Sequence, residues 1–399
     1  MYRLLLTLAC LLSALGAQAQ TVLFHTGDST GFPYRIPAIA TARGGQIVAL
    51  TDRRPCGGDI GFGRVDILGR TSDDNGASWS APFEVLVGTG SGPDTGFGDA
   101  CLVADRERRE LLLVCASGDV PYWKSTPAHP LRIVATRAGW DRKAGRWVWE
   151  QPADLTELFY QDLFGGNIGG LFMGSGRICQ SRQIKKGRYY RLYAALCTHR
   201  GNFVVYSDDF GRTWDVLGSA TQSCAPKGDE PKCEELPDGS VLLSSRKQGG
   251  RYFNIFRYTD TDAARGVWGA AVDSKTAPGG IRNEGGACNG EILILPVRDA
   301  AGSRTWLALQ SIPAGPARSH VTLYWKELAG RADYLTPLAF ASDWEGSYEV
   351  TDKGSGYSTM TLQADGRIGF FYEEEPGAYQ MVYRALDLAD VTGGRFHTE

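Results

Sequence analysis

The fold of this chain is decided by a short pattern that occurs twice, Ser72-Asp73-Asp74-Asn75-Gly76-Ala77-Ser78-Trp79 and Ser207-Asp208-Asp209-Phe210-Gly211-Arg212-Thr213-Trp214. Both copies fit Ser-x-Asp-x-Gly-x-Thr-Trp, with Ser78 in place of threonine in the first. In each copy we expect the Asp and the Gly to form the tight turn of a hairpin while the Trp packs beneath it. A degenerate third copy is expected at Thr259–Trp268. These boxes indicate a fold, and we assign them no chemistry.

The rest of the chain alternates short β-rich runs with glycine, aspartate or proline, and only 153–163 has a hint of helical period. Strands are expected at 46–50, 65–71, 111–115, 131–136, 189–196, 203–206, 241–245, 252–258, 292–297, 306–309, 321–326, 368–372 and 381–386. Strands this numerous must close on themselves or repeat radially to protect their edges. The recurring box favours radial repetition, so we predict an all-β propeller of four-stranded sheets.

Composition excludes several classes of protein. A net charge of -3 without a basic stripe argues against nucleic acid as the main partner. No stretch beyond the N-terminus approaches the roughly 18 uninterrupted apolar residues of a membrane span. The five histidines have no ligand spacing and there is no Cys-x-x-Cys, so no metal site is predicted.

The N-terminus has the pattern of a secretion signal. Met1-Tyr2-Arg3 is followed by an apolar run, Leu4–Gly16, and by an Ala-x-Ala cleavage site ending at Ala19. We therefore expect a signal peptide over 1–19 and export of 20–399 to the periplasm or the exterior. A lipoprotein cut before Cys10 is the alternative, but it leaves only about six apolar residues ahead of the cut, against the roughly 7–15 expected.

The cysteines leave two interpretations open. Of the nine in the chain, eight remain after the signal. An even count in an oxidising compartment permits disulfides, with Cys224 and Cys233 as the first candidate pair because they are close in sequence. In a chain this large the alternative is small, buried, free cysteines.

Three polar residues share one offset from a hairpin turn. Arg35, Glu230 and Tyr357 each lie nine positions before a glycine that leads into a new strand. The glycines are Gly44, Gly239 and Gly366. The three residues should therefore occupy the same place in three blades and face one another across a central pocket. Arg35 is also pinned within Tyr34-Arg35-Ile36-Pro37, where its planar guanidinium is suited to receive a carboxylate.

These features together resemble the bacterial exo-sialidases of the retaining glycoside hydrolase family 33. The resemblance rests on Tyr34–Pro37, the two boxes, Asp59-Ile60-Gly61, Asp229-Glu230-Pro231 and Gly354–Tyr357. It extends from about Thr21 to near the C-terminus. It implies a single six-bladed catalytic propeller that hydrolyses terminal α-linked sialic acid from glycans, glycoproteins or glycolipids with retention of configuration, and that needs no cofactor.

The resemblance implies that Arg35, Arg246 and Arg318 grip the sialic acid carboxylate. Either Arg53 or Arg54 should line the pocket beside the catalytic acid. An arginine six residues before the acid is usual in the family, which favours Arg53.

Asp59 matches the general acid/base of the family, and its glycine-rich loop, 55–61, suits a residue that must reach a leaving-group oxygen. Asp66 is a local competitor, but it lies within an alternating strand and is expected to support the sheet. Asp99 resembles the family aspartate that hydrogen-bonds a hydroxyl of the sugar, with a turn role as the alternative.

Tyr357 and Glu230 match the nucleophile and its activating base. The anomeric carbon of sialic acid already carries a carboxylate, so a neutral phenol avoids the like charge that a carboxylate nucleophile would meet. With an ordinary pKa near 10, the phenol needs a base. Glu234 and Glu235 are rivals for that role, but only Glu230 has the nine-residue offset.

Two alternatives to hydrolysis stay open. The enzyme could transfer sialic acid to another sugar or intramolecularly, and a propeller without activity could simply bind sialic acid. For the N-acetyl pocket and the leaving-group side, the candidates are Tyr122–Trp123 and the loop 165–177, by their aromatic and glycine content. The oligomeric state is not indicated by the sequence.

Overall fold

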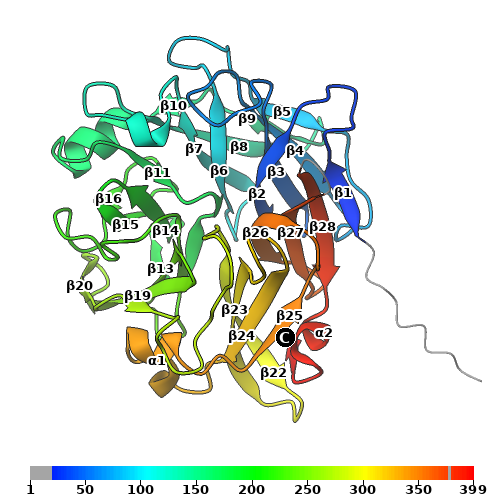
Figure 1. Ribbon diagram of the computed structural model, residues 1–399, viewed down its shortest axis with the longest axis vertical. Coiled ribbons are helices and arrows are strands. Elements are labelled where there is room, and N and C mark those ends of the chain that lie inside the picture. Colours follow the sequence, from blue (N-terminus) through cyan, green and yellow to red (C-terminus); the bar gives the residue numbers. More distant parts are fainter. Residues whose placement is uncertain (1–19, 376–378) are drawn as a thin grey trace, which may run out of the picture.

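Six β-sheets surround a central axis in the computed structural model, which describes residues 20–375 and 379–399 (Figure 1). The predicted signal segment, with Cys10, lies outside the described residues. The sheets are the blades of a six-bladed propeller, which confirms the propeller predicted from the boxes and the six blades implied by the family resemblance. Every predicted strand coincides with a strand of the structure. The helical hint at 153–163 becomes a short strand followed by one π-helical turn, η2 (Leu158–Leu163).

The first three blades follow the chain from the axis outward. Blade 1 is β2 (Tyr34–Thr41), β3 (Ile47–Arg53), β4 (Asp66–Ser72) and β5 (Phe83–Leu86). Blade 2 is β6 (Phe97–Ala104), β7 (Glu110–Ser117), β8 (Arg132–Asp141), β9 (Arg146–Trp149) and β10 (Ala153–Asp154), with β12 (Gly176–Arg177) parallel to β6. Blade 3 is β11 (Leu171–Met173), β13 (Cys179–Lys186), β14 (Tyr189–Thr198), β15 (Gly201–Ser207) and β16 (Asp215–Val216).

The other three blades repeat the arrangement. Blade 4 is β17 (Pro231–Glu235), β18 (Val241–Lys247), β19 (Gly250–Asp260), β20 (Arg265–Trp268) and β21 (Val272–Asp273). Blade 5 is β22 (Ile292–Asp299), β23 (Arg304–Pro313), β24 (Val321–Glu327), β25 (Gly346–Glu349) and β29 (Phe396–Thr398). Blade 6 is β26 (Ser355–Leu362), β27 (Ile368–Glu374), β28 (Gln380–Leu386) and β1 (Thr21–Phe24). The short helices are η1 (Tyr122–Lys124), η3 (Arg331–Tyr334), α1 (Pro337–Ala341) and α2 (Leu388–Thr392).

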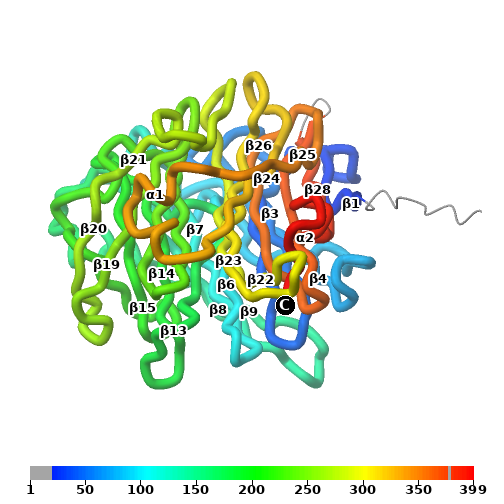
Figure 2. The backbone as a smooth tube through the Cα atoms, turned by 90° about the horizontal axis from the view of Figure 1, so that it is seen from below, coloured from blue at the N-terminus to red at the C-terminus, as the bar shows by residue number. Residues whose placement is uncertain are grey.

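Blade 6 joins the two ends of the chain. Its outermost strand, β1, pairs antiparallel with β28, and Figure 2 shows the ring edge-on with β1 at the rim beside β28. Gln20 adds a side-chain hydrogen bond of 2.9 Å to Glu374 on β27. The ring is thus closed by pairing between the first strand of the described chain and the last blade.

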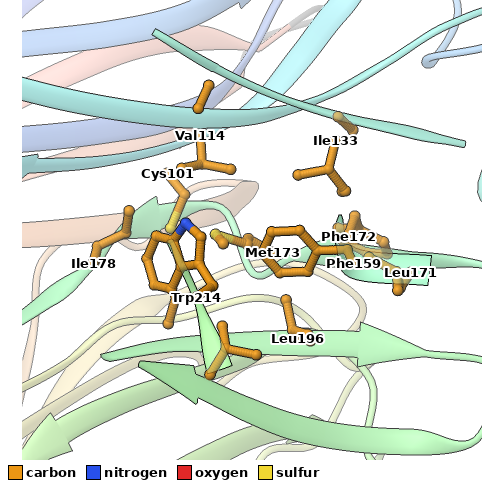
Figure 3. Close-up of a cluster of buried hydrophobic side chains, with 14 of the residues drawn as sticks. Cys101, Val114, Ile133, Phe159, Leu171, Phe172, Met173, Ile178, Leu196 and Trp214 are labelled. Atoms are coloured by element: carbon orange, nitrogen blue, oxygen red, sulfur yellow. The ribbon is translucent and has the colours of Figure 1, made fainter. Parts of the chain in front are cut away.

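The boxes at 72–79 and 207–214 close hairpins through the same hydrogen bonds. In the first, Asp74 accepts from the Ser72 hydroxyl at 2.8 Å and from the Ser78 backbone N–H at 2.8 Å. Asp209 repeats this in the second copy, where Trp214 packs in the largest apolar cluster, between blades 2 and 3 (Figure 3). The segment 259–268 differs, because it is the β19–β20 hairpin with Asp260 directly opposite Arg265.

All eight cysteines in the described part of the chain are free thiols. The candidate disulfide between Cys224 and Cys233 is therefore not formed. Both side chains are buried in one apolar cluster between blades 3 and 4, and the Cys224 thiol donates to the Asn202 carbonyl at 3.1 Å. The second interpretation is therefore confirmed for Cys224 and Cys233, which are free cysteines that pack as small apolar side chains.

Across the described residues, none of the helices combines the length and the apolar character required to cross a bilayer.

Candidate active site

The starts of three inner strands converge on one cavity of about 410 Å³. Arg35 comes from β2, Glu230 from the residue before β17 and Tyr357 from β26, as the shared offset predicts. The three hairpins have the same length, but Gly45, and not Gly44, is the turn residue equivalent to Gly239 and Gly366. The count from Gly44 still works because a bulge between Arg35 and Ala38 adds one residue to β2. Their glycines all have positive φ, which glycine adopts without steric cost: Gly44 (96°), Gly239 (83°) and Gly366 (85°).

Tyr357, Glu230 and Arg246 form a hydrogen-bonded group at the floor of this cavity. The Tyr357 hydroxyl donates to Glu230 Oε1, and Arg246 Nη1 donates to Glu230 Oε2 at 2.9 Å and to the Tyr357 hydroxyl at 3.2 Å. Burial, and then the Glu230 carboxylate, raise the pKa of Tyr357 well above its usual value, although Arg246 opposes the shift. The phenol is therefore protonated and already in contact with a base that can take its proton.

Arg35 is held by a carboxylate that the sequence did not indicate. Glu373 on β27 accepts from Arg35 Nε at 2.7 Å and from Nη2 at 3.2 Å. The same carboxylate accepts from the backbone N–H of Ile36 at 2.8 Å and of Tyr357 at 3.0 Å. Ile36 has φ of 62°, an unfavourable conformation for a β-branched residue, so these bonds hold the backbone as well as the guanidinium.

Arg318 also lines this half of the cavity, and Tyr379, which is not among the lining residues, lies beside Arg35. The guanidinium carbon of Arg318 lies 5.6 Å from the centre of the Tyr357 ring. The guanidinium carbon of Arg35 lies 5.5 Å from the centre of the same ring. Arg35 also lies 4.7 Å from the centre of the Tyr379 ring. Three arginines thus surround the phenol, and a bound anion would relieve their mutual repulsion.

The opposite wall is acidic. Asp59 lies in its predicted loop with its side chain about half exposed, and its Oδ1 is 3.2 Å from Arg54 Nη2. The same Nη2 donates to buried Asp52 at 2.9 Å. Asp99 lines the cavity at φ of 57° and donates its backbone N–H to Asp52 at 3.2 Å. One guanidinium therefore pairs with two carboxyl groups, those of Asp52 and Asp59.

Crowding of these carboxyls changes their acidity. Burial raises the pKa of Asp52 to about 7, partly opposed by Arg54. Burial, followed by the charges of Asp59 and Asp52, raises the pKa of Asp99 well above its usual value. A protonated Asp99 can both donate and accept, which suits contact with a hydroxyl group.

Arg53, which the family spacing favours as a pocket residue, lies elsewhere. Its guanidinium pairs with Asp66 at 2.7 Å and with Glu84 at 3.0 Å. Successive side chains of a strand point to opposite faces, so Arg54 reaches the cavity and Arg53 does not. Asp66, with a backbone N–H and two arginines as partners, supports the sheet as expected.

The remaining predicted positions are also accounted for. Tyr122 and Trp123 line the cavity, as does Phe172 from the 165–177 segment. Asp229, which was not predicted, lines it too, with Oδ2 at 3.2 Å from Arg246 Nε. Glu234, a rival for the base, lies at the other end of β17 and pairs with other arginines. Within 20–375 and 379–399 no group of three potential metal ligands occurs.

Comparisons with known proteins identify sialidases of similar sequence. The chain is 29% identical over 371 residues to a sialidase of Micromonospora viridifaciens, covering 87% of this chain and 51% of that protein. It is 20% identical over 395 residues to a sialidase of Bacteroides fragilis, covering 92% of this chain and 64% of that protein. The chain thus spans between half and two thirds of the curated relatives it matches. No family model matches it.

Solved structures show the same fold. The Hadza microbial sialidase Hz136 superposes with a TM-score of 0.72 at 20% identity, covering 93% of this chain and 69% of that one. An intramolecular trans-sialidase from Ruminococcus gnavus superposes with a TM-score of 0.71 at 14% identity, covering 93% and 98%. The resemblance to sialidases expected from the sequence motifs is confirmed in sequence similarity and in fold.

Proposed function

We propose that this protein is an exo-α-sialidase, which hydrolyses terminal sialic acid from sialylated glycans with retention of configuration. The observation that carries the proposal is the Tyr357–Glu230 hydrogen bond, set among Arg35, Arg246 and Arg318 in one cavity. A pocket that only bound sialic acid would use the arginines but would have no need of a phenol in contact with a base. The similarity to curated sialidases supports the same activity.

The arginines would bind the substrate carboxylate. Two of them approach the Tyr357 ring from different blades, Arg35 from β2 and Arg318 from the segment before β24. Planar guanidiniums can make paired hydrogen bonds to a carboxylate. This clamp would place the anomeric carbon, to which the carboxylate is attached, next to the Tyr357 hydroxyl.

In the first half of the reaction, the Tyr357 oxygen attacks the anomeric carbon while its proton passes to Glu230. The bond to the leaving oxygen breaks, and Asp59 donates a proton to that oxygen. A covalent sialyl-tyrosine results, a route for which sialidases are the recognised exception among glycosidases that use two carboxylates. Arg246, which donates to both partners, would stabilise the phenolate as it forms.

In the second half, Asp59 takes a proton from water, the water oxygen attacks the same carbon, and Glu230 returns its proton to the departing Tyr357. Two displacements on one carbon give net retention. Its half-exposed position on a loop lets Asp59 serve both the leaving group and water. Transfer to another sugar, or to a hydroxyl of the sialic acid itself, would share the first half and differ only in the acceptor.

The test is release of 4-methylumbelliferone from its α-sialoside by the purified protein, with proton NMR of the freed sugar. We expect fluorescence and the α-anomer of sialic acid as the first product. An anhydro product would replace hydrolysis by intramolecular transfer. No release, with a sialic acid glycal still bound, would contradict the roles of Asp59, Glu230 and Tyr357.

We also propose that the protein is exported, to the periplasm or the exterior. The pattern in 1–19 supports this. Mass spectrometry of the protein recovered outside the cytoplasm should give a mature chain that begins at Gln20. A cytoplasmic, uncleaved chain would contradict it.

A further inference from the structure

A second cavity, of about 360 Å³, lies at the other end of the propeller axis. Thr41, Glu234 and Thr361 line it, and they lie at or near the far ends of β2, β17 and β26, the strands whose first residues lead into the candidate active site. Figure 1 looks along this axis. We call it the far cavity, and the lining residues that matter here are Arg106, Arg177, Arg182, Glu234, Leu293 and Leu362.

The far cavity is separated from the candidate active site by side chains that fill the axis. Lys232 is fully buried, with Nζ 3.7 Å from Glu291 Oε2, and Thr359 donates its hydroxyl to the same carboxylate at 2.9 Å. A Cβ on Gly176 would come within 2.4 Å of Lys232 Nζ, so the space between them is taken. The far cavity is therefore a separate compartment with its own opening.

Two arginines of the far cavity, Arg177 and Arg182, are held by hydrogen bonds, and each also has an N–H donor without a hydrogen-bond partner among the described residues. Arg177 Nη2 donates to the Ile292 carbonyl at 2.9 Å and to Glu234, and Arg182 Nη1 donates to the Ile294 carbonyl at 2.8 Å. The Nε–H groups of both arginines are buried and have no hydrogen-bond partner among the described residues. Buried donors of this kind are costly unless something accepts from them.

The charges of the lining do not balance. Arg106 uses Nε and Nη2 to bond Gln180, which is neutral, so its charge is not compensated there. Glu234 is the single carboxylate among the lining residues, against three guanidiniums. Burial opposes its ionisation, but Arg177 and Arg182 hold the pKa of Glu234 below its usual value, so it is ionised. Glu235, which does not line the cavity, has Oε2 3.6 Å from Arg182 Nε and offsets part of that charge. The excess positive charge therefore lies mainly on Arg106, whose hydrogen bonds go to neutral Gln180.

The rest of the wall is apolar. It is built from strand ends, with Val103 from β6, Ile178 beside β12, and Leu293 and Leu295 from β22. Leu362 is 38% exposed. A ligand that suits this lining needs an anionic group for the arginines and an apolar body for the wall.

We propose that the far cavity binds a small organic anion, a carboxylate, sulfonate or phosphate with an apolar body, whose charged group is received by Arg106 and Arg177. This site is independent of the proposed sialidase activity. Because its lining comes from every blade, an occupant would also stabilise the closed ring, by mass action on the folded state.

Isothermal titration calorimetry with naphthalene-2-sulfonate tests the proposal, and naphthalene-2-sulfonamide serves as its neutral isostere. We expect the sulfonate to bind and to raise the melting temperature, and the sulfonamide to bind at least tenfold more weakly. Arg106→Gln should weaken sulfonate binding on the order of tenfold, as expected for loss of a charge-assisted contact. Leu362→Glu, which adds a negative charge to the wall, should weaken it further.

Two matched arginine variants give the controls. Arg304→Gln removes an exposed, ion-paired arginine on β23, and Arg318→Gln removes one from the candidate active site. Both should bind the sulfonate as the unaltered protein does. Absence of binding, equal binding of the sulfonamide, or loss of binding in Arg318→Gln with Arg106→Gln unaffected would each overturn the proposal.

Discussion

Replacing Glu373 by glutamine tests how the candidate active site is held together. The glutamate carboxylate accepts four hydrogen bonds, two from Arg35 and two from backbone N–H groups. Glutamine has the same shape but only one acceptor oxygen. Whichever way its amide points, the NH₂ group faces one N–H of Arg35 and one backbone N–H, so two of the four bonds are lost and Arg35 loses its counter-charge.

The expected cost follows from burial. The Glu373 side chain is 0% exposed and that of Arg35 is 23% exposed. Breaking a buried ion pair by removing one partner costs roughly 3–5 kcal/mol, and the partial exposure of Arg35 places this pair near 3 kcal/mol. With an unfolding entropy of about 2.1 cal/mol/K per residue, that loss lowers the melting temperature of a chain of this size by about 4 °C.

Calorimetric melting of Glu373→Gln and its hydrolysis of methylumbelliferyl α-sialoside are the measurements. We expect the lower melting temperature together with a fall in kcat/KM on the order of a hundredfold, because Arg35 and the Tyr357 backbone lose the same support. Glu84→Gln is the control, since it removes an exposed carboxylate from Arg53 and should cost less than about 1 kcal/mol. An unchanged melting temperature and unchanged kinetics in Glu373→Gln would refute the reasoning.

Three further outcomes are expected. Tyr357→Phe should abolish turnover while a sialic acid glycal still binds, and parallel loss of glycal binding would point to a structural role instead. Arg35→Lys should weaken both substrate binding and turnover, roughly tenfold or more, because an ammonium cannot make the paired bonds of a guanidinium, and unchanged kinetics would remove Arg35 from the clamp. Burial raises the pKa of Asp52 from 3.8 to about 7, so its contribution to stability is full below about pH 4 and is lost as the pH rises through 7. Asp52→Asn should therefore flatten the decline in unfolding free energy between pH 4 and 8, and denaturant titrations that give parallel declines for both proteins would contradict this.

The positions that the sequence predicts well are those set by the repeat itself. Arg35, Glu230 and Tyr357 share a distance from a hairpin turn, and hairpin length determines where a residue lies along an inner strand. Equal offsets mean equal heights in strands that pair without a bulge. In blade 1 the bulge between Arg35 and Ala38 compensates for Gly44, which lies one position earlier in its turn than Gly239 and Gly366 do in theirs. No knowledge of how the blades pack is needed for that prediction.

The sequence did not identify Arg54 as the pocket residue, because the face to which its side chain points depends on the register between β2 and β3. In the structure Arg35 pairs with Asp52, and Tyr34 with Arg53, so Arg54 shares the face of Arg35 and Asp52. A bulge between Arg35 and Ala38 shifts this register, and no sequence pattern shows the bulge. The family spacing, counted along the chain, accordingly favours the neighbouring Arg53.

Glu373 could not have been found from the sequence, because it acts between blades. It belongs to β27 in blade 6 and holds Arg35 in blade 1, across 338 positions of sequence. Its place beneath Tyr357 depends on a second register shift, between Ser355 and Ser358. A carboxylate at the end of a buried strand rich in Phe and Tyr indicates that a cationic group pairs with it. The sequence does not show that this group is Arg35, because the two residues come together only when the blades pack.

The position of β1 gives the molecule a mechanical weak point. This four-residue strand is paired only with β28. A pulling force on it would break its backbone hydrogen bonds to β28 one after another. The next strands inward are β27, which carries Glu373, and β26, which carries Tyr357. Load applied ahead of Thr21, for instance by a surface tether, would thus reach the proposed nucleophile through two strands, whereas the same load applied beyond β29 would fall on blade 5.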